Sequence, residues 1–292
     1  MLSQELKTAS NAAFPFTVVD GKLTDIPIPY IDNLAPAGSI SSCVKDMSAW
    51  LMVQLNNGKI DTIQVIPEKA ILAIRMPYSI MGVDPRDKQE THFYLYGLGL
   101  EINDRNGRLV YSHTGGVDGF LSSVMFIPEE KIGFVVLTNN DQNNFFQNLT
   151  DEIRDAFLGL PYQDYSDKSF TVFKKGIDKS KAKIDSLKNE VKLFNRTSLP
   201  IEEYTGTYTN KVYGDIAIKK EKNNLNIHFS NHPDLIGKLE HIKNDVFLCT
   251  YSNPTMGIVE IPFNIENEKV NGLTLRVADF VEFTPYIFVK NK

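Results

Sequence analysis

The sequence predicts an α/β domain followed by an all-β domain, on three observations. Two apolar runs, 121–128 and 132–140, flank a tight turn at 129–131, and a third run, 94–102, precedes them; this pattern is typical of neighbouring antiparallel strands. Apolar residues at helical spacing occur before and after these strands. From Leu199 onward, short strand-like segments alternate with Asn, Gly and Lys turns, which indicates a meandering barrel or sandwich.

The composition bounds the class of protein. A chain of 292 residues with 42% hydrophobic and 23% charged residues can form one large or two modest globular domains. The formal net charge of −5 argues against general nucleic-acid binding. No apolar run reaches membrane-spanning length, and residues 1–10 lack the pattern of a signal peptide. The two cysteines, Cys43 and Cys249, fall in different predicted domains, which excludes a disulfide framework.

The helices are predicted from their apolar stripes and their ends. Prolines interrupt residues 1–40, which are expected to be irregular. Ser41 or Ser42 can then cap a helix that ends at the Asn-Asn-Gly of 56–58. A short helix is expected after Pro67, and another over 143–158.

A lysine-rich segment, residues 161–198, separates the two predicted domains. Its apolar residues keep helical spacing, so we expect a linking helix. One interpretation is a basic helix that binds a membrane surface or an acidic partner. The other is a helix with a solvated lysine face; Asp178, Asp185 and Glu190, which interrupt the basic run, favour it.

The stretch with the strongest functional signal is His113-Thr114-Gly115-Gly116, near the end of a predicted strand. Two adjacent glycines in a strand suggest that another group approaches the backbone closely there. A substrate is the functional interpretation. The alternative is that the glycines form a tight turn and His113 is an ordinary strand residue.

This stretch, with the Gly-Val-Asp-Gly-Phe of 116–120 and the Leu-Thr-Asn-Asn of 137–140, resembles the third motif of the serine beta-lactamase and penicillin-binding-protein superfamily. The segment 36–51 is similar to the one that precedes this strand in the class C-like serine hydrolases. The resemblance covers residues 11–159. It implies a sheet-and-helix domain over 1–160 that performs acyl transfer at an amide or ester, as a peptidase, an esterase or a beta-lactamase.

The resemblance also implies roles for four residues. His113 would lie beside the nucleophile, Thr114 and Gly115 would line the strand edge along which the substrate lies, and the Gly116 N–H would donate to the oxyanion. The implied substrate is a small molecule or peptide with a carbonyl group, and the implied location is periplasmic or extracellular. No cofactor is expected.

The superfamily's other two motifs, Ser-x-x-Lys and Tyr-x-Asn, are not found in their expected places. Ser42-Cys43-Val44-Lys45 fits the first, but helix capping explains Ser42. Both matches to the second, at 208–210 and 251–253, follow His113, whereas the family places this motif before the strand. We therefore expect a truncated catalytic domain that is inactive alone. Its missing strands would leave an unpaired sheet edge, through which the chain could self-associate.

Residues 199–292 open with Tyr-x-Gly-x-Tyr at 204–208 and resemble the lipocalin-like barrel that often follows class C-like hydrolases. This domain supports an alternative function, a non-catalytic binding protein whose barrel holds an apolar ligand or a protein partner. His228, His232 and His241 lack accompanying cysteines or clustered carboxylates, so no metal site is predicted.

Overall fold

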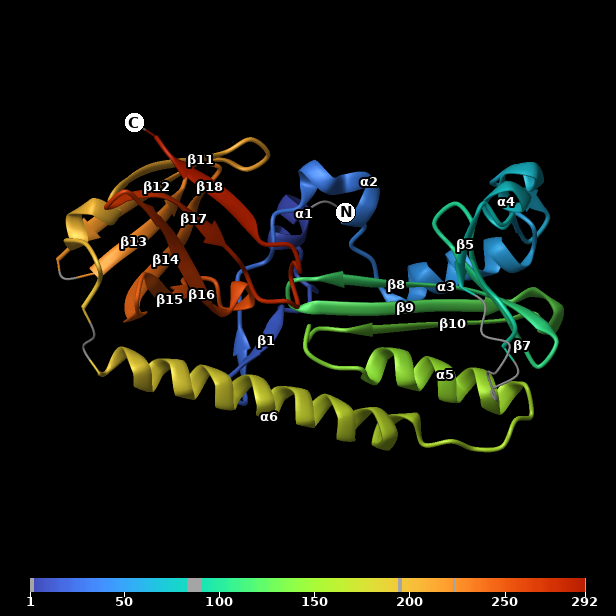
Figure 1. Cartoon of the computed structure of the whole chain (residues 1–292). Coiled ribbons are helices and arrows are strands. Elements are labelled where there is room, and N and C mark those ends of the chain that lie inside the picture. Colours follow the sequence, from blue (N-terminus) through green and yellow to red (C-terminus); the bar gives the residue numbers. More distant parts are fainter. Residues whose placement is uncertain (1–2, 83–90, 194–195, 223, 292) are drawn as a thin grey trace. The chain divides into compact units, whose positions relative to one another are not determined.

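The computed structural model describes residues 3–82, 91–193, 196–222 and 224–291 (Figure 1). The chain divides into two compact units, with the boundary between Lys174 and Lys175. These are called the N-terminal and C-terminal units below. No helix among the described residues is both long enough and apolar enough to span a membrane.

A six-stranded antiparallel sheet forms the centre of the N-terminal unit in the described part of the chain. Each strand pairs with its sequence neighbour, so the sheet is a meander in the order β10-β9-β8-β7-β6-β5. The predicted run 94–102 divides into two strands, because the chain turns at Gly97 and Gly99. The strands are β5 (Ser79–Gly82), β6 (Tyr94–Tyr96), β7 (Glu101–Arg105), β8 (Arg108–Val117), β9 (Phe120–Ile127) and β10 (Ile132–Thr138).

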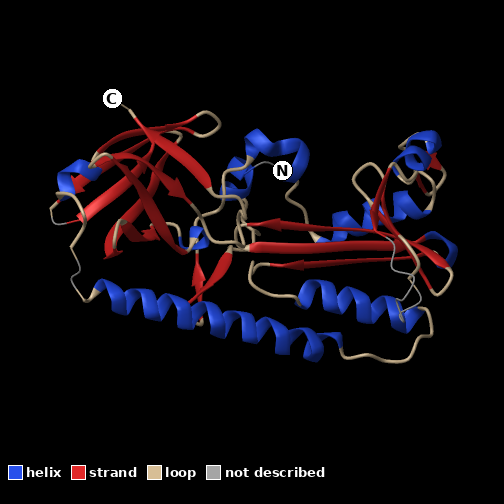
Figure 2. Cartoon of the chain, viewed as in Figure 1, coloured by secondary structure: helices blue, strands red, loops and turns tan. Residues whose placement is uncertain are grey.

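Helices cover both faces of this sheet (Figures 1 and 2). Residues on opposite sides of a strand alternate, so Tyr111 and Phe126 lie on one face while Val110 and Met125 lie on the other. Helix α3 (Val44–Leu55) packs Leu51 against the first face. Helix α5 (Phe145–Phe157) lies on the second face, and Leu158, which follows this helix, packs against Val110 and Met125. The result is the predicted α/β domain, in three layers.

The N-terminal segment is more regular than predicted. It contains α1 (Ser3–Thr8) and a hairpin formed by β1 (Phe16–Val19) and β2 (Lys22–Asp25). Asp20 and Gly21 form the hairpin turn with positive φ angles of 49° and 77°. The remaining elements are 3-10 helix η1 (Asp32–Leu34), α2 (Ala35–Gly38), β3 (Lys59–Ile60), β4 (Ile63–Gln64) and α4 (Glu68–Ile74), which follows Pro67 as predicted.

The lysine-rich segment contains α6 (Tyr165–Val191), and the boundary between the units falls inside this helix. In the C-terminal unit, Leu187 is buried against Ile242 and Leu248. Two ion pairs accompany this contact, Lys183–Glu260 at 2.8 Å and Lys243–Glu190 at 2.9 Å. These contacts leave most of the lysines exposed, an arrangement that agrees with the solvated-face interpretation.

The C-terminal unit is a closed antiparallel barrel, which confirms the predicted all-β barrel (Figure 2). The structure adds one strand that was not predicted, because residues 232–243 form a long strand. The barrel strands are β11 (Gly206–Asn210), β12 (Gly214–Glu221), β13 (Asn224–Phe229), β14 (His232–Lys243), β15 (Val246–Tyr251), β16 (Ile258–Glu266), β17 (Lys269–Leu275) and β18 (Tyr286–Lys290).

Large apolar side chains occupy the barrel interior. Tyr204, Phe247 and Phe263 meet edge to face with ring centroids 5.1–5.3 Å apart. Tyr208 is fully buried beside them and donates a hydrogen bond to the Tyr204 carbonyl oxygen at 2.7 Å. Aromatic rings of this size pack the barrel interior as a core.

Candidate active site

The end of β8 has a free edge. On one side, β9 pairs with β8 as far as Val117, opposite Phe120. On the other side, β7 pairs with β8 only as far as Ser112, opposite Glu101. Within the described residues, 113–117 therefore have no strand on their second edge. Backbone N–H and C=O groups along such an edge can pair with an extended ligand.

This edge opens into a groove of about 1080 Å³ within the N-terminal unit. The sequence-predicted residues His113, Thr114, Gly115 and Gly116 all line it. Gly115 and Gly116 are exposed, whereas the two preceding residues are half-buried. The remaining walls come from three parts of the N-terminal unit. They are α1 with the loop after it, the segment 28–43 with one side of α3, and the ends of β9 and β10.

His113 is held by two hydrogen bonds. Its Nδ1 lies 2.5 Å from the Thr114 carbonyl oxygen, and its Nε2 lies 2.9 Å from the Tyr96 hydroxyl. A carbonyl oxygen can only accept, so Nδ1 carries the hydrogen and donates it. In the neutral ring Nε2 is then the acceptor, and the Tyr96 hydroxyl donates to it. Both nitrogens of the imidazole are therefore engaged.

The glycine pair leaves room for the neighbouring strand. A Cβ at Gly115 would lie 2.7 Å from the Ser122 hydroxyl oxygen, and one at Gly116 would lie 3.2 Å from a Leu121 methyl carbon. Both neighbours belong to β9, which pairs with β8 here. Glycine at these positions thus allows close strand packing and also leaves the free edge uncovered.

Asp141 fixes the turn that follows the glycines. Asp141 is 1% exposed, and one of its carboxylate oxygens accepts a hydrogen bond from the Gly119 N–H at 2.8 Å. The Asp141 N–H donates to the Phe16 carbonyl oxygen, and Asn139 Nδ2 donates to that of Phe14. The loop after β10 therefore ties the N-terminal hairpin and the β8–β9 turn together beside the groove.

Ser42 is not the N-cap that the sequence suggested. The N-cap of α3 is Cys43, which makes no side-chain cap hydrogen bond, so the prediction that Ser41 or Ser42 caps this helix is wrong. The helix starts two residues after Ser42, which places this serine outside it. Ser42 lines the groove, whereas Lys45 is not among the lining residues. Of this Ser-x-x-Lys match, the groove lining therefore includes the serine.

The two Tyr-x-Asn matches belong to the barrel. Tyr208 and Tyr251 are buried there, and each donates its hydroxyl to a backbone carbonyl oxygen, that of Tyr204 at 2.7 Å and that of Arg276 at 2.5 Å. Burial raises the pKa of both phenols above the usual range. Both tyrosines thus have structural partners in the C-terminal unit.

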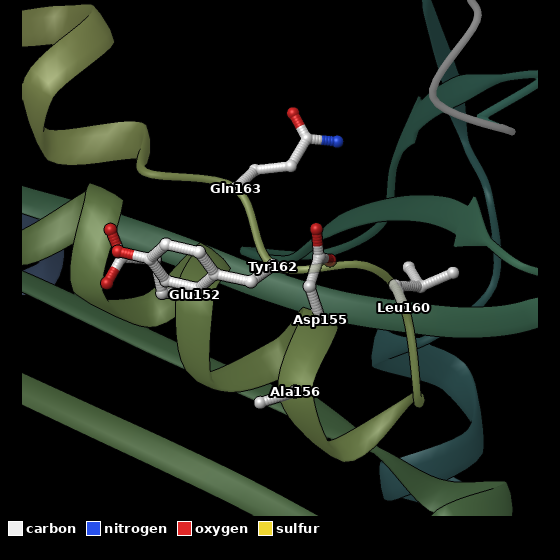
Figure 3. Close-up of a pocket in the computed structure, with 6 residues that line it drawn as sticks. All are labelled: Glu152, Asp155, Ala156, Leu160, Tyr162 and Gln163. Atoms are coloured by element: carbon white, nitrogen blue, oxygen red, sulfur yellow. The ribbon is translucent and has the colours of Figure 1, made fainter.

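A second, smaller cavity of about 80 Å³ lies at the end of α5 and the loop after it (Figure 3). Glu152 and Asp155 are its acidic lining residues. The Asp155 carboxylate already accepts hydrogen bonds from Arg105, Arg154 and Tyr165. Among the described residues, no group of three or more His, Cys, Asp or Glu side chains is arranged to hold a metal ion. We interpret this cavity as part of a structural ion cluster.

Tyr96 and Asp141 are the two residues near the groove that sequence reasoning missed. Tyr96 lies 17 positions before His113, and Asp141 lies 22 positions after Gly119. Only strand pairing brings these residues together. The order of the strands along the sequence was the available signal, because in a meander it predicts which strands lie side by side.

Replacing Tyr96 with phenylalanine tests the hydrogen bond to His113. We expect the free energy of unfolding to fall by ~1 kcal/mol, because one partly buried hydrogen bond is lost. The imidazole ¹⁵N spectrum should show a change at Nε2, while Nδ1 keeps its hydrogen. Tyr78→Phe, at an exposed tyrosine, is the control and should change neither quantity. An unaltered Nε2 resonance in Tyr96→Phe would contradict the assignment.

The N-terminal unit is thus a three-layer domain whose central sheet leaves one strand edge free beside His113-Thr114-Gly115. The family model described as "Beta-lactamase" matches residues 4–158, more than half of the chain. The chain belongs to the beta-lactamase and penicillin-binding-protein-like serine hydrolase family. A second model, "Domain of unknown function (DUF3471)", matches residues 194–288, which contain the barrel.

Individual relatives are more distant. A curated protein named "Unguisins hydrolase ungD", from Aspergillus violaceofuscus (strain CBS 115571), is 26% identical over 173 residues, 53% of this chain and 30% of that protein. The octameric penicillin-binding protein homologue from Pyrococcus abyssi has a TM-score of 0.44 at 17% identity, over 98% of this chain and 55% of that one. A D-stereospecific amidohydrolase from Streptomyces sp. has a TM-score of 0.39 at 17% identity, over 52% and 41%. The chain spans less than two thirds of the length of each of these proteins.

Proposed function

We propose that this chain takes part in acyl transfer at an amide or ester, as a serine hydrolase of the peptidase, esterase or beta-lactamase type. The observation that carries the proposal is the unpaired edge of β8 over residues 113–117, which borders a large groove. A substrate laid along this edge exchanges hydrogen bonds with backbone groups, and its carbonyl group comes to lie beside the glycine pair.

In this proposal, the Gly116 N–H donates to the carbonyl oxygen as negative charge develops on it. Thr114 and Gly115 hold the extended part of the substrate, and His113 presents to the groove an imidazole that two hydrogen bonds hold in place. The loss of one oxyanion donor costs roughly 3–4 kcal/mol of transition-state stabilisation in serine hydrolases. The backbone at Gly116 therefore contributes chemistry that no side chain in the motif supplies.

The proposal extends to what the chain lacks. The one Ser-x-x-Lys before His113 starts at Ser42, outside α3, and its Lys45 is not among the groove-lining residues. No Tyr-x-Asn occurs before His113. A nucleophilic serine needs an adjacent base to be activated. We therefore expect these 292 residues to bind the acyl group without turning it over when they act alone.

The test is hydrolysis of a chromogenic ester and a cephalosporin by the purified chain and by Ser42→Ala. We expect the same background rate from both. Turnover that disappears in Ser42→Ala would refute the absence of a nucleophile. A chimera supplies the positive arm: the Ser-x-x-Lys and Tyr-x-Asn segment of an active family member is joined before residue 1, and ester hydrolysis should appear.

In that chimera, Gly116→Pro removes the proposed donor N–H and should lower kcat by about 10²–10³-fold. Thr138→Val is the matched control in the same groove, because it removes a hydroxyl that bonds only the Leu121 carbonyl oxygen among the described contacts. An equal loss of activity in both variants would contradict a specific role for Gly116.

The alternative function, a binding protein with an apolar ligand in its barrel, has less support. The inward-facing residues of the barrel form one buried cluster around Tyr204, Phe247 and Phe263. A ligand of ordinary size needs a cavity of a few hundred Å³. These three rings are buried against one another and fill space in the barrel interior. The large groove lies instead in the N-terminal unit, beside the sequence motif.

A further inference from the structure

The groove beside His113 carries very little charge. Asp46 is the one residue among its lining side chains with a full charge at neutral pH, and no lysine or arginine lines it within the described residues. A carboxylate bound in a protein groove needs a cationic or strong hydrogen-bond partner, because removal from water is otherwise unfavourable. Among the described side chains that line the groove, no lysine or arginine is available to such a carboxylate.

Two other sources of positive potential are already compensated. The N-terminus of α3 borders the groove at Cys43, and its partial positive charge would attract an anion. Asp46 lies in the first turn of that helix and offsets this charge. Both nitrogens of the His113 imidazole are engaged by Thr114 and Tyr96, so neither is left to hydrogen-bond an anion.

Apolar side chains line much of the remaining surface. Met47 and Trp50 of α3 face the groove from one wall, and Val124 and Leu137 of the sheet face it from another. At about 1080 Å³ the groove is as large as the pockets that hold drug-sized ligands. Its size and its lining fit an extended apolar group.

From these three observations we propose a substrate class for the groove: uncharged amides or esters with a large apolar acyl group, in preference to peptides that end in a free carboxylate next to the scissile bond. This inference rests on the proposed function for its location at residues 113–116. The specificity itself follows from the charge and the lining of the groove.

The test is a binding comparison with a matched pair of ligands, N-octanoyl-D-alanine and its C-terminal amide. Titrations of the full chain are followed by the ¹H–¹⁵N signals of Gly115 and Gly116, and calorimetry gives the affinities. We expect the amide to bind roughly tenfold more tightly than the acid, because only the acid places a charge in a groove without cations.

Asp46→Lys reverses the one charge in the groove. It should reduce the preference for the amide by about fivefold, since it replaces repulsion of the carboxylate with attraction at an exposed position. Asp178→Lys is the control, because it changes the net charge equally at an exposed residue of the C-terminal unit. The control should keep the wild-type preference.

The outcomes separate the two proposals. Equal affinities, or tighter binding of the acid, with shifts at Gly115 and Gly116 would overturn the inference and leave the proposed function standing. Equal responses to Asp46→Lys and Asp178→Lys would also overturn it. Shifts confined to other amides, or no binding of either ligand, would overturn both proposals.

Discussion

Replacing Asp155 with alanine is expected to lower the free energy of unfolding of the N-terminal unit by about 3–5 kcal/mol. The Asp155 carboxylate accepts hydrogen bonds from Arg105 at 2.7 and 3.2 Å, from Arg154 at 2.8 Å and from the Tyr165 hydroxyl at 2.6 Å. The Arg105 and Asp155 side chains are only 4% and 3% exposed. The variant would leave the buried guanidinium charge of Arg105 without this carboxylate.

Urea unfolding followed by tryptophan fluorescence measures this loss. Trp50 is the single tryptophan of the chain and lies in α3, so its emission reports on the N-terminal unit. Glu130→Ala is the matched control: it removes the carboxylate of the more exposed Arg108–Glu130 pair and should cost no more than about 1 kcal/mol. Similar losses in the two variants would contradict a special role for the buried cluster.

The same cluster gives a pH dependence of known sign. Burial raises the pKa of the Asp155 carboxyl, but the hydrogen bonds from Arg105, Arg154 and Tyr165 outweigh it and hold that pKa below its usual range. The stabilisation is therefore complete above the unfolded-state pKa of about 3.9 and is lost as the pH falls through the lower folded-state pKa. The difference between wild type and Asp155→Asn should accordingly shrink below about pH 4.

The fold could be predicted where local pattern and tertiary structure agree. The turn at 129–131 and the apolar stripes of α3 and α5 specify a strand pair and two helices without help from distant residues. The β1–β2 hairpin was not predicted, although Asp20-Gly21 is a strong turn signal. The prolines of residues 1–40 indicate irregular structure and contradict that signal. Strand β14 was not predicted because Pro233 and Gly237 have low strand propensity. Its pairing with β13 and β15 stabilises the strand in spite of this low propensity.

Part of the candidate site could likewise be predicted from the sequence, and part could not. The motif at 113–116 could be located from the sequence because consecutive residues form it, and the structure places it along a groove. Tyr96 and Asp141 could not be found, because their contacts depend on the pairing of separate strands and on the loop after β10. The capping prediction at Ser41 and Ser42 failed because the helix begins one residue later than a serine cap requires.

Replacing Gly119 with alanine is expected to destabilise the N-terminal unit by roughly 2–5 kcal/mol, through two separate effects. Gly119 has a φ angle of +80°, which costs other residues about 1–2 kcal/mol. A Cβ there would also lie 2.2 Å from Pro15 Cβ and 2.9 Å from the Phe16 backbone nitrogen. Relief of this overlap requires movement of the N-terminal hairpin or of the β8–β9 turn, and Trp50 fluorescence during urea unfolding measures the cost.

Gly107→Ala separates strain from overlap. Gly107 has a φ angle of +73° in the β7–β8 turn, and nothing lies within 4 Å of its Cβ position, so this variant should lose only about 1–2 kcal/mol. Gly119 lies three residues after Gly116, and its N–H donates a hydrogen bond to Asp141. Gly119→Ala should therefore also shift the ¹H–¹⁵N signals of Gly115 and Gly116, whereas Gly107→Ala should not. Equal losses of stability, with the glycine signals unmoved, would mean that the turn does not position the free edge of β8.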